Sequence, residues 1–266
     1  MPTPSGLITL LTDFGDRDWF VASMKGAILS IHPHATIVDL SHRVPAHAVE
    51  DGAYLLKSCY RYFPEGTIHV AVVDPGVGSG RRPLIVKSSR YFFLAPDNGL
   101  LTHVFNEEKD HEIRELENTR FRLESAGHTF DGRDVFAPAA AWLAKGEPFE
   151  SFGPVLVDCK KWSIAVPRWE GGQLIGEVAY VDRFGNLITN VTVAHLKEVR
   201  EVLGRPMPFI RIGECLIDGL VNSYSEGDPE APRALINSEG AVEIFLNQAN
   251  AAEQLSLGRK TRVVLS

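Results

Sequence analysis

Carboxylate and guanidinium side chains gather in four short segments of this sequence of 266 residues. The first segment is Thr12-Asp13-Phe14-Gly15, which follows an apolar run. A carboxylate at such a place can accept two hydrogen bonds from a vicinal diol, such as that of a ribose. The alternative is that Asp13 caps the next helix, a position that Asp favours.

The second segment, 74–82, reads DPGVGSGRR and follows another apolar run. Its three glycines allow the backbone to come close to a ligand. No GK[ST] and no helical pattern follow, so the segment is neither a Walker loop nor a dinucleotide fingerprint. Asp74 and Arg81 are either a plain ion pair or a charged pair that orients a water molecule in an apolar cleft.

The third segment, 129–134, reads TFDGRD, has His128 just upstream of it, and leads into an alanine-rich run. A helix cap with an ion pair is the structural interpretation, and Asp134 stands where the N-cap is expected. The functional interpretation concerns Asp131 and His128. His128 is a candidate proton carrier, or else a polar loop residue.

The fourth segment is 182–186, DRFGN, which the segment 237–240, NSEG, complements further along the chain. An aromatic ring such as Phe184 can stack on a purine while the amide of Asn186 reads the base edge. Segments rich in Asn, Gly and Asp are also typical of hairpin turns, so each remains a turn candidate.

The elements that must position these segments follow an alternating pattern. Strands are predicted over residues 7–11, 36–40 and 67–73, helices over 19–31, 49–62 and 134–145, and a hairpin over 84–87 and 91–94. Alternation of strand and helix is typical of an α/β domain with a mostly parallel sheet covered on both faces. Ligands bind at the carboxyl ends of the strands in such sheets, which is where Asp13 and Asp74 stand.

The sequence pattern changes at residues 162–172, which carry Pro167 and a Gly-Gly pair and lack helical periodicity. This segment is predicted to be the linker between two domains. Short strands are predicted beyond them, over 174–182, 186–191, 208–212, 242–245 and 262–265. Short strands separated by turns favour an antiparallel β domain. The predicted domains are therefore 1–162 and 172–266.

The composition of the chain argues against some classes of partner and cofactor. A net charge of −7 without a basic run argues against nucleic acid and anionic membranes as partners. Cys59, Cys159 and Cys215 form no CxxC pair, so we expect free thiols and no metal site. No segment approaches the ~20 apolar residues of a membrane span and no leader pattern is present, so we expect a cytoplasmic protein.

Taken together, these segments resemble one family, the S-adenosyl-L-methionine (SAM) hydrolases, relatives of fluorinase and chlorinase. The similarity runs over nearly the whole chain, in the order TDFG, KGAILSI, VVDPGVGSGRR, APDNGLL, TFDGRDVFAPAAA, FGNLITN and NSEG. It implies hydrolysis of SAM to adenosine and L-methionine without a cofactor. It also implies an α/β N-terminal domain, a C-terminal antiparallel β-barrel, and a homotrimer with each active site between domains of neighbouring subunits.

The resemblance also implies roles for single residues. Asp13 matches the aspartate that grips both ribose hydroxyls, and Asp74 and Arg81 match two members of a trio that handles the water. The remaining matches surround the rest of the substrate, with Asp182 near the methionine amino group, Phe184, Asn186 and Tyr224 around the adenine, and Ser238 near the methionine carboxylate.

The sequence departs from the family pattern at two places. Asp131 stands where the hydrolases have a histidine in a TFHGRD-like segment, so either Asp131 or His128 takes that role. Glu239 stands where the halogenases have an arginine near the methionine carboxylate.

The halogenases have a tyrosine at the position of Asp74. An ionised carboxylate there would repel chloride by several kcal/mol in a low-dielectric pocket, which favours hydrolysis. The alternatives are a SAM-dependent halogenase and a non-catalytic sensor of adenosine or SAM.

Overall fold

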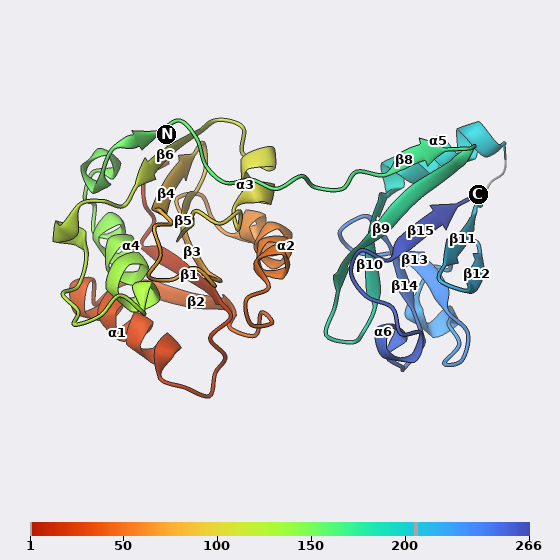
Figure 1. Cartoon of the computed structure of the whole chain (residues 1–266), viewed down its shortest axis with the longest axis horizontal. Helices are drawn as coiled ribbons and strands as arrows, with labels where there is room; N and C mark the ends of the chain where they lie inside the picture. Colours follow the sequence, from red (N-terminus) through yellow and green to blue (C-terminus); the bar gives the residue numbers. More distant parts are fainter. Residues whose placement is uncertain (1, 205–206) are drawn as a thin grey trace. The chain divides into compact units, whose positions relative to one another are not determined.

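Short apolar segments form a central sheet in the first part of the chain (Figure 1). The computed structural model describes residues 2–204 and 207–266, and the chain divides between Trp162 and Ser163 into two units. The strands of the first unit are β1 (Leu7–Thr12), β2 (Thr36–Ser41), β3 (Ile68–Val72), β4 (Pro83–Ser88), β5 (Phe92–Pro96), β6 (His111–Glu115) and β7 (Val155–Leu156). They lie in the order β2-β1-β3-β5-β4-β6-β7.

The sheet has a parallel part and an antiparallel part. Strands β2, β1, β3 and β5 run parallel to one another. Strand β4 pairs antiparallel with β5, as the predicted hairpin requires, and β6 and β7 continue this antiparallel part. The parallel part carries the strand ends at which the sequence predicted a site.

Helices cover both faces of this sheet, as the alternating pattern predicted. Helices α1 (Phe20–Ile31) and α4 (Ala137–Ala144) share one apolar core with Ile8 and Leu10 of β1. Helices α2 (Val49–Cys59) and α3 (Thr102–Glu107) lie on the opposite face, where they share a core with Leu11. Successive side chains of a strand point to opposite faces, so one short strand serves both cores. Three 3₁₀ turns complete the unit, η1 (Tyr60–Tyr62), η2 (Thr119–Phe121) and η4 (Phe149–Phe152).

The helix predicted over 134–145 has a different start. A π-helical turn, η3 (Gly132–Phe136), precedes α4. Pro138 has no N–H to donate to the carbonyl of Asp134, so the α-helical pattern cannot continue back through this point and the turn widens. The prediction that Asp134 caps the helix is wrong: its carboxylate accepts from Nε of Arg133 at 2.6 Å.

The second unit is an antiparallel barrel-like sheet, as predicted. Its strands are β8 (Arg168–Glu170), β9 (Gln173–Val181), β10 (Leu187–Thr192), β11 (Phe209–Ile212), β12 (Cys215–Asp218), β13 (Arg233–Ile236), β14 (Ala241–Phe245) and β15 (Arg262–Leu265). They lie in the order β12-β11-β15-β9-β10-β14-β13, with β8 beside β9. The end strands β12 and β13 also contact each other, which brings the sheet near to closure.

Some elements of the second unit were not predicted from the sequence. Strand β8 lies within the segment read as a linker, and α5 (Val193–Leu203) follows β10 directly. Thr192 and His195 form a capping box at the start of α5, and Leu196 and Val199 are buried on its inner side. The short elements η5 (Tyr224–Glu226) and α6 (Ala251–Gln254) lie in loops.

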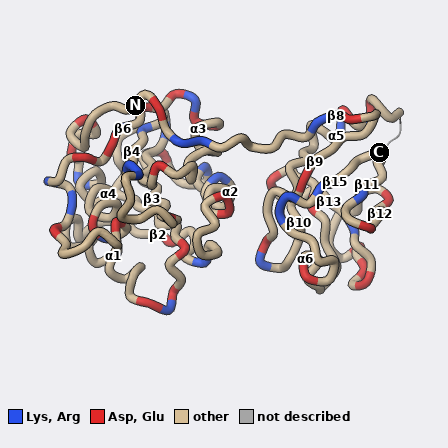
Figure 2. The backbone as a smooth tube through the Cα atoms, in the orientation of Figure 1, with Lys and Arg blue, Asp and Glu red and all other residues tan. Residues whose placement is uncertain are grey.

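Basic residues (Lys and Arg) and acidic residues (Asp and Glu) are interspersed along the backbone of each unit (Figure 2). Among the helices of the described residues, none combines the length and the apolar composition needed to cross a membrane.

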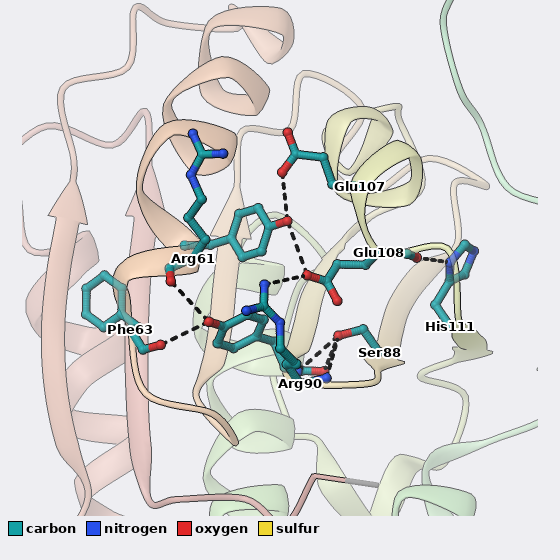
Figure 3. A network of polar contacts seen from close by, with 9 residues as sticks. Arg61, Phe63, Ser88, Arg90, Glu107, Glu108 and His111 are labelled. Carbon is teal, nitrogen blue, oxygen red and sulfur yellow. Dashed lines mark hydrogen bonds and ion pairs between the residues drawn. The ribbon is translucent and has the colours of Figure 1, made fainter. Parts of the chain in front are cut away.

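A polar network lies near the amino end of β3, away from the strand ends discussed below (Figure 3). The hydroxyl of Tyr60 donates to Glu107 at 2.8 Å and to the buried Glu108 at 3.3 Å. Arg90 donates to the same oxygen of Glu108 at 3.3 Å. Burial, then the hydrogen bond to Glu107 and its charge, raise the pKa of Tyr60, so its hydroxyl keeps its proton.

Candidate active site

The pairing of β1 with β3 brings two of the predicted site residues together. Thr12 lies opposite Val72 in this parallel pair, and Asp13 and Asp74 follow these strand ends. Both aspartates line a cavity of about 300 Å³, which we call the strand-end cavity. Its other lining residues are Phe14, Phe20, Ala46, His47, Val72, Val77, Thr129, Phe130, Asp131 and Gly132.

Two of these lining residues, Asp74 and Asp131, belong to a buried ion-pair network. Arg81 donates to Oδ2 of Asp74 through Nε at 2.7 Å and through Nη2. The same Nη2 donates to Oδ2 of Asp131 at 2.6 Å. The side chains of Asp74, Arg81 and Asp131 are only 4%, 6% and 16% exposed. The structure thus joins these three residues, which we call the charged trio.

The guanidinium of the trio stays charged. Burial alone would lower the pKa of Arg81, but the hydrogen bonds and charges of Asp74 and then of Asp131 outweigh burial and raise it. Its guanidinium carbon also lies 5.8 Å from the centre of the Phe136 ring. One cation between two carboxylates leaves an excess of negative charge, which suits a partner that is cationic or that gives up a proton.

His128 lines a different space from Asp13 and Asp74. Its side chain is exposed and lines a hollow of about 690 Å³ that Arg81 and Asp131 also line. It does not belong to the lining of the strand-end cavity, whereas Asp131 lines both spaces.

The glycine-rich loop is needed for a close approach between two backbone segments. Gly78 has φ +76°, and a Cβ at this position would come within 2.8 Å of the carbonyl oxygen of His128. Because glycine has no Cβ, the loop that carries Arg81 can lie close to the loop that carries Asp131.

Asp13 is not the cap of α1, because that helix begins only at Phe20. The segment after β2 positions it instead. The N–H of His47 donates to Oδ2 of Asp13 at 2.9 Å, and the carbonyl of His42 accepts from the N–H of Gly15 at 2.7 Å. Sequence reasoning missed this segment, although two histidines after a strand that pairs with β1 were a signal.

In the second unit, Asp182 organises the turn between β9 and β10. Its Oδ1 accepts from the N–H of Phe184 at 2.9 Å and of Asn186 at 2.8 Å. Its Oδ2 accepts from the side-chain amide of Asn186 at 2.9 Å. The Phe184 ring stands out from this turn and is 76% exposed. The segment is therefore a hairpin turn that presents an aromatic ring.

Tyr224 lies in the same unit. Its hydroxyl donates to Oε1 of the buried Glu243 at 2.6 Å, and Oε2 of Glu243 accepts from the side chain of Asn237 at 3.1 Å. Burial, the hydrogen bond to Glu243 and the nearby charge of Asp182 raise the pKa of Tyr224. Glu243 was not predicted, although a glutamate inside the apolar strand AVEIF was a signal.

The two remaining predicted residues lie in the turn between β13 and β14. Ser238 is exposed, and Glu239 is half-buried with its N–H donated to Oδ1 of Asn237 at 3.0 Å. The first unit thus offers a carboxylate suited to a diol and a charged trio. The second unit offers an exposed aromatic ring, a phenol and an amide.

Comparison with known proteins identifies the family. Models of the N-terminal and C-terminal domains of SAM hydroxide adenosyltransferases match residues 8–153 and 176–264. A curated (R)-S-adenosyl-L-methionine hydrolase from Thermus thermophilus is 36% identical over 257 residues, which cover 94% of this chain and 95% of the relative. A fluorinase from an Actinoplanes species is 30% identical over 280 residues, covering 94% of each chain.

Solved structures agree with this result. The crystal structure of an uncharacterized conserved protein from Thermotoga maritima matches with a TM-score of 0.88 and 32% identity, covering 97% of this chain and 99% of that one. The chain belongs to the SAM hydroxide adenosyltransferase family.

Proposed function

We propose that this protein hydrolyses SAM to adenosine and L-methionine. The observation that carries the proposal is the buried charged trio, whose two carboxylates, Asp74 and Asp131, line the same cavity as Asp13. Curated relatives at 32% to 36% identity are named (R)-S-adenosyl-L-methionine hydrolase, which supports the same reaction.

The reaction is a displacement at the 5′ carbon of the ribose. The oxygen of a water molecule forms a bond to this carbon, and the carbon–sulfur bond breaks with its electron pair going to sulfur. The sulfonium leaves as the neutral thioether of methionine, so the leaving group needs no acid. The difficulty lies in the nucleophile, because the pKa of water is about 15.7.

The trio addresses this difficulty in two ways. Holding one water in line with the departing sulfur is worth roughly 7–11 kcal/mol. Asp74 accepts the proton of that water, and the guanidinium of Arg81 stabilises the hydroxide that develops. Asp131 shares Nη2 of Arg81 with Asp74 and so fixes the direction of the guanidinium.

The trio is also a poor place for a halide. Two carboxylates face one guanidinium there, so an incoming chloride would meet an excess of negative charge. Such repulsion is strong where water is excluded. Water, which gains stabilisation by giving up a proton, is the nucleophile that fits.

The other parts of the substrate need further contacts. Asp13 takes the ribose diol, and the exposed ring of Phe184 with Asn186 and Tyr224 takes the adenine. Asp182, Ser238 and Glu239 take the amino acid part of SAM. The resemblance to the family supports these assignments. It also supports a homotrimer in which the second unit of a neighbouring subunit completes each strand-end cavity.

The test is to incubate the purified protein with SAM in water enriched in ¹⁸O, with and without chloride, and to separate the products. We expect adenosine and methionine in equal amounts, with the label in the 5′ oxygen of adenosine. Formation of 5′-chloro-5′-deoxyadenosine as the main product would make the protein a halogenase. Binding of SAM without turnover would make it a sensor.

A further inference from the structure

A chain of polar contacts leads from the surface of α1 toward Asp13. Nζ of Lys25 lies 2.6 Å from Oδ2 of Asp39 on β2. Oδ1 of Asp39 lies 3.1 Å from Nε2 of His42, within ion-pair range although not in line for a hydrogen bond. The imidazole of His42 is 10% exposed, so the contact is shielded from water.

The other side of the His42 ring reaches the turn that presents Asp13. Nδ1 of His42 lies 2.8 Å from Oγ1 of Thr12, whose side chain is fully buried. The same oxygen accepts from the N–H of Phe14 at 3.2 Å. His42 is thus connected to the residues on both sides of Asp13.

A neutral His42 ring gives this chain of contacts a consistent arrangement of protons. A ring nitrogen that faces a carboxylate carries a proton, since two lone pairs would repel, so Nε2 of His42 is protonated. In the neutral ring Nδ1 is then an acceptor, and the Thr12 hydroxyl donates to it. The Thr12 oxygen remains free to accept from Phe14, so the Thr12 hydroxyl and Nδ1 of His42 both have partners.

We propose that His42 is a positioning residue that holds Asp13 in place for the ribose diol through the hydroxyl of Thr12. This inference rests on the proposed function, in which Asp13 binds the ribose. Without the acceptor at Nδ1, the buried Thr12 hydroxyl loses its partner and the turn from Thr12 to Gly15 loosens. The ribose is held in the ground state and in the transition state alike, so affinity changes and turnover at saturation does not.

Two substitutions separate the two sides of the ring. His42→Asn places an amide oxygen near the position of Nδ1 and keeps an acceptor for Thr12. His42→Gln places its amide near Nε2, keeps a donor for Asp39, and leaves Thr12 without an acceptor. We expect the Kd for adenosine to rise about five- to tenfold in His42→Gln, the scale of one buried hydrogen bond, and to stay within about twofold in His42→Asn.

The readouts are titration calorimetry with adenosine and with 2′,3′-dideoxyadenosine, and kcat with saturating SAM. Because the effect passes through the diol, neither variant should change the Kd for 2′,3′-dideoxyadenosine or kcat by more than about twofold. A general loosening of the fold would weaken both ligands together. In an Asp13→Ala background, His42→Gln should have no further effect on adenosine binding, as for two residues that act through one contact.

The outcomes separate this inference from the proposed function. If Asp13→Ala leaves the affinity for adenosine unchanged, the ribose assignment fails and His42 has nothing to position. If Asp13→Ala weakens adenosine while His42→Gln does not, only the role of His42 is overturned. Equal losses in His42→Asn and His42→Gln would also overturn it, because the acceptor for Thr12 would then be irrelevant.

Discussion

At the scale of single residues, the arrangement of Arg81 distinguishes this site from an ordinary ion pair. One guanidinium nitrogen serves both Asp74 and Asp131, and these two carboxylates line the strand-end cavity. Arg82, the next residue in the chain, forms a comparable ion pair with Asp97 at 2.6 Å. Asp97 does not line the strand-end cavity, so it provides a matched comparison.

The first prediction concerns Asp74. Asp74→Asn keeps the shape of the side chain and removes the base, so turnover should fall about 100-fold or more. The Kd for SAM should move little, because the charge of the water changes only on the way to the transition state. Single-turnover rates and calorimetry measure the two quantities. Asp97→Asn, equally buried at 4% side-chain exposure, should keep turnover within about threefold.

Unchanged turnover in Asp74→Asn would show that this carboxylate is not the base. A comparable loss in Asp97→Asn would show that the effect belongs to buried ion pairs in general rather than to the cavity.

The second prediction decides which residue stands in for the family histidine. Asp131 bonds Arg81 at 2.6 Å and lines the strand-end cavity, whereas His128 is exposed in the neighbouring hollow. Asp131→Ala should therefore lower kcat at least about 100-fold, and His128→Ala should stay within about threefold of the unaltered protein. Steady-state rates with saturating SAM test this. A complete loss of activity in His128→Ala alone would reverse the assignment.

At the scale of elements, the parallel strands and their end residues could be read from sequence, because short β-branched runs and strand-end carboxylates are local signals. The contact of Asp13 with the N–H of His47 could not be read, since it depends on how far the segment after β2 folds back. The π-helical turn at Asp134 was missed because one proline cancelled the capping pattern. Helix α5 was missed because it is a single helix among short strands.

Strand β3 carries a buried histidine that no site uses. His69 is fully buried, and its ring stacks on Phe93 with a centroid distance of 5.2 Å. Its Nδ1 lies 2.7 Å from Oγ1 of Thr9, and Nε2 has no hydrogen-bond partner among the described residues. Burial lowers the pKa of His69 to about 3, so the ring stays neutral in the folded protein.

The third prediction follows from this pKa. Between pH 6.5 and about 3 the unfolded chain binds a proton at His69 and the folded chain does not, so stability falls as the pH falls. The loss is about 1.4 kcal/mol per pH unit, or about 2 kcal/mol between pH 6.5 and pH 5. His69→Asn keeps an acceptor for Thr9 and does not titrate, so it should lack this part of the slope.

Amide exchange of β3 measures the effect in the first unit, because buried core amides exchange through its most extensive opening. Parallel pH profiles in the two proteins would mean that the folded state accommodates a proton at His69 and would contradict the prediction.

At the scale of the whole molecule, the chemistry divides between the two units. The charged trio and Asp13 belong to the first, and the exposed rings of Phe184 and Tyr224 belong to the second. Large exposed aromatic rings commonly mark surfaces that bind a ligand or a partner. The proposed homotrimer gives these rings a use, because it sets the second unit of one subunit against the strand-end cavity of another.

The fourth prediction tests this assembly. Light scattering should give three times the chain mass of 29.3 kDa, or a multiple of that value.

Asp74→Asn damages only the first unit, and Phe184→Ala combined with Tyr224→Ala damages only the second. Each variant alone should be nearly inactive at low SAM. Suppose that every site is formed by the first unit of one subunit and the second unit of its neighbour. A mixed trimer from co-expression then contains an intact site wherever the undamaged first unit of one variant lies beside the undamaged second unit of the other. Random mixing in equal amounts should restore about a quarter of the original activity, since each half of a site is intact with a chance of about one half. Sites formed within single subunits would give no recovery, and a fully active monomer would contradict the assembly outright.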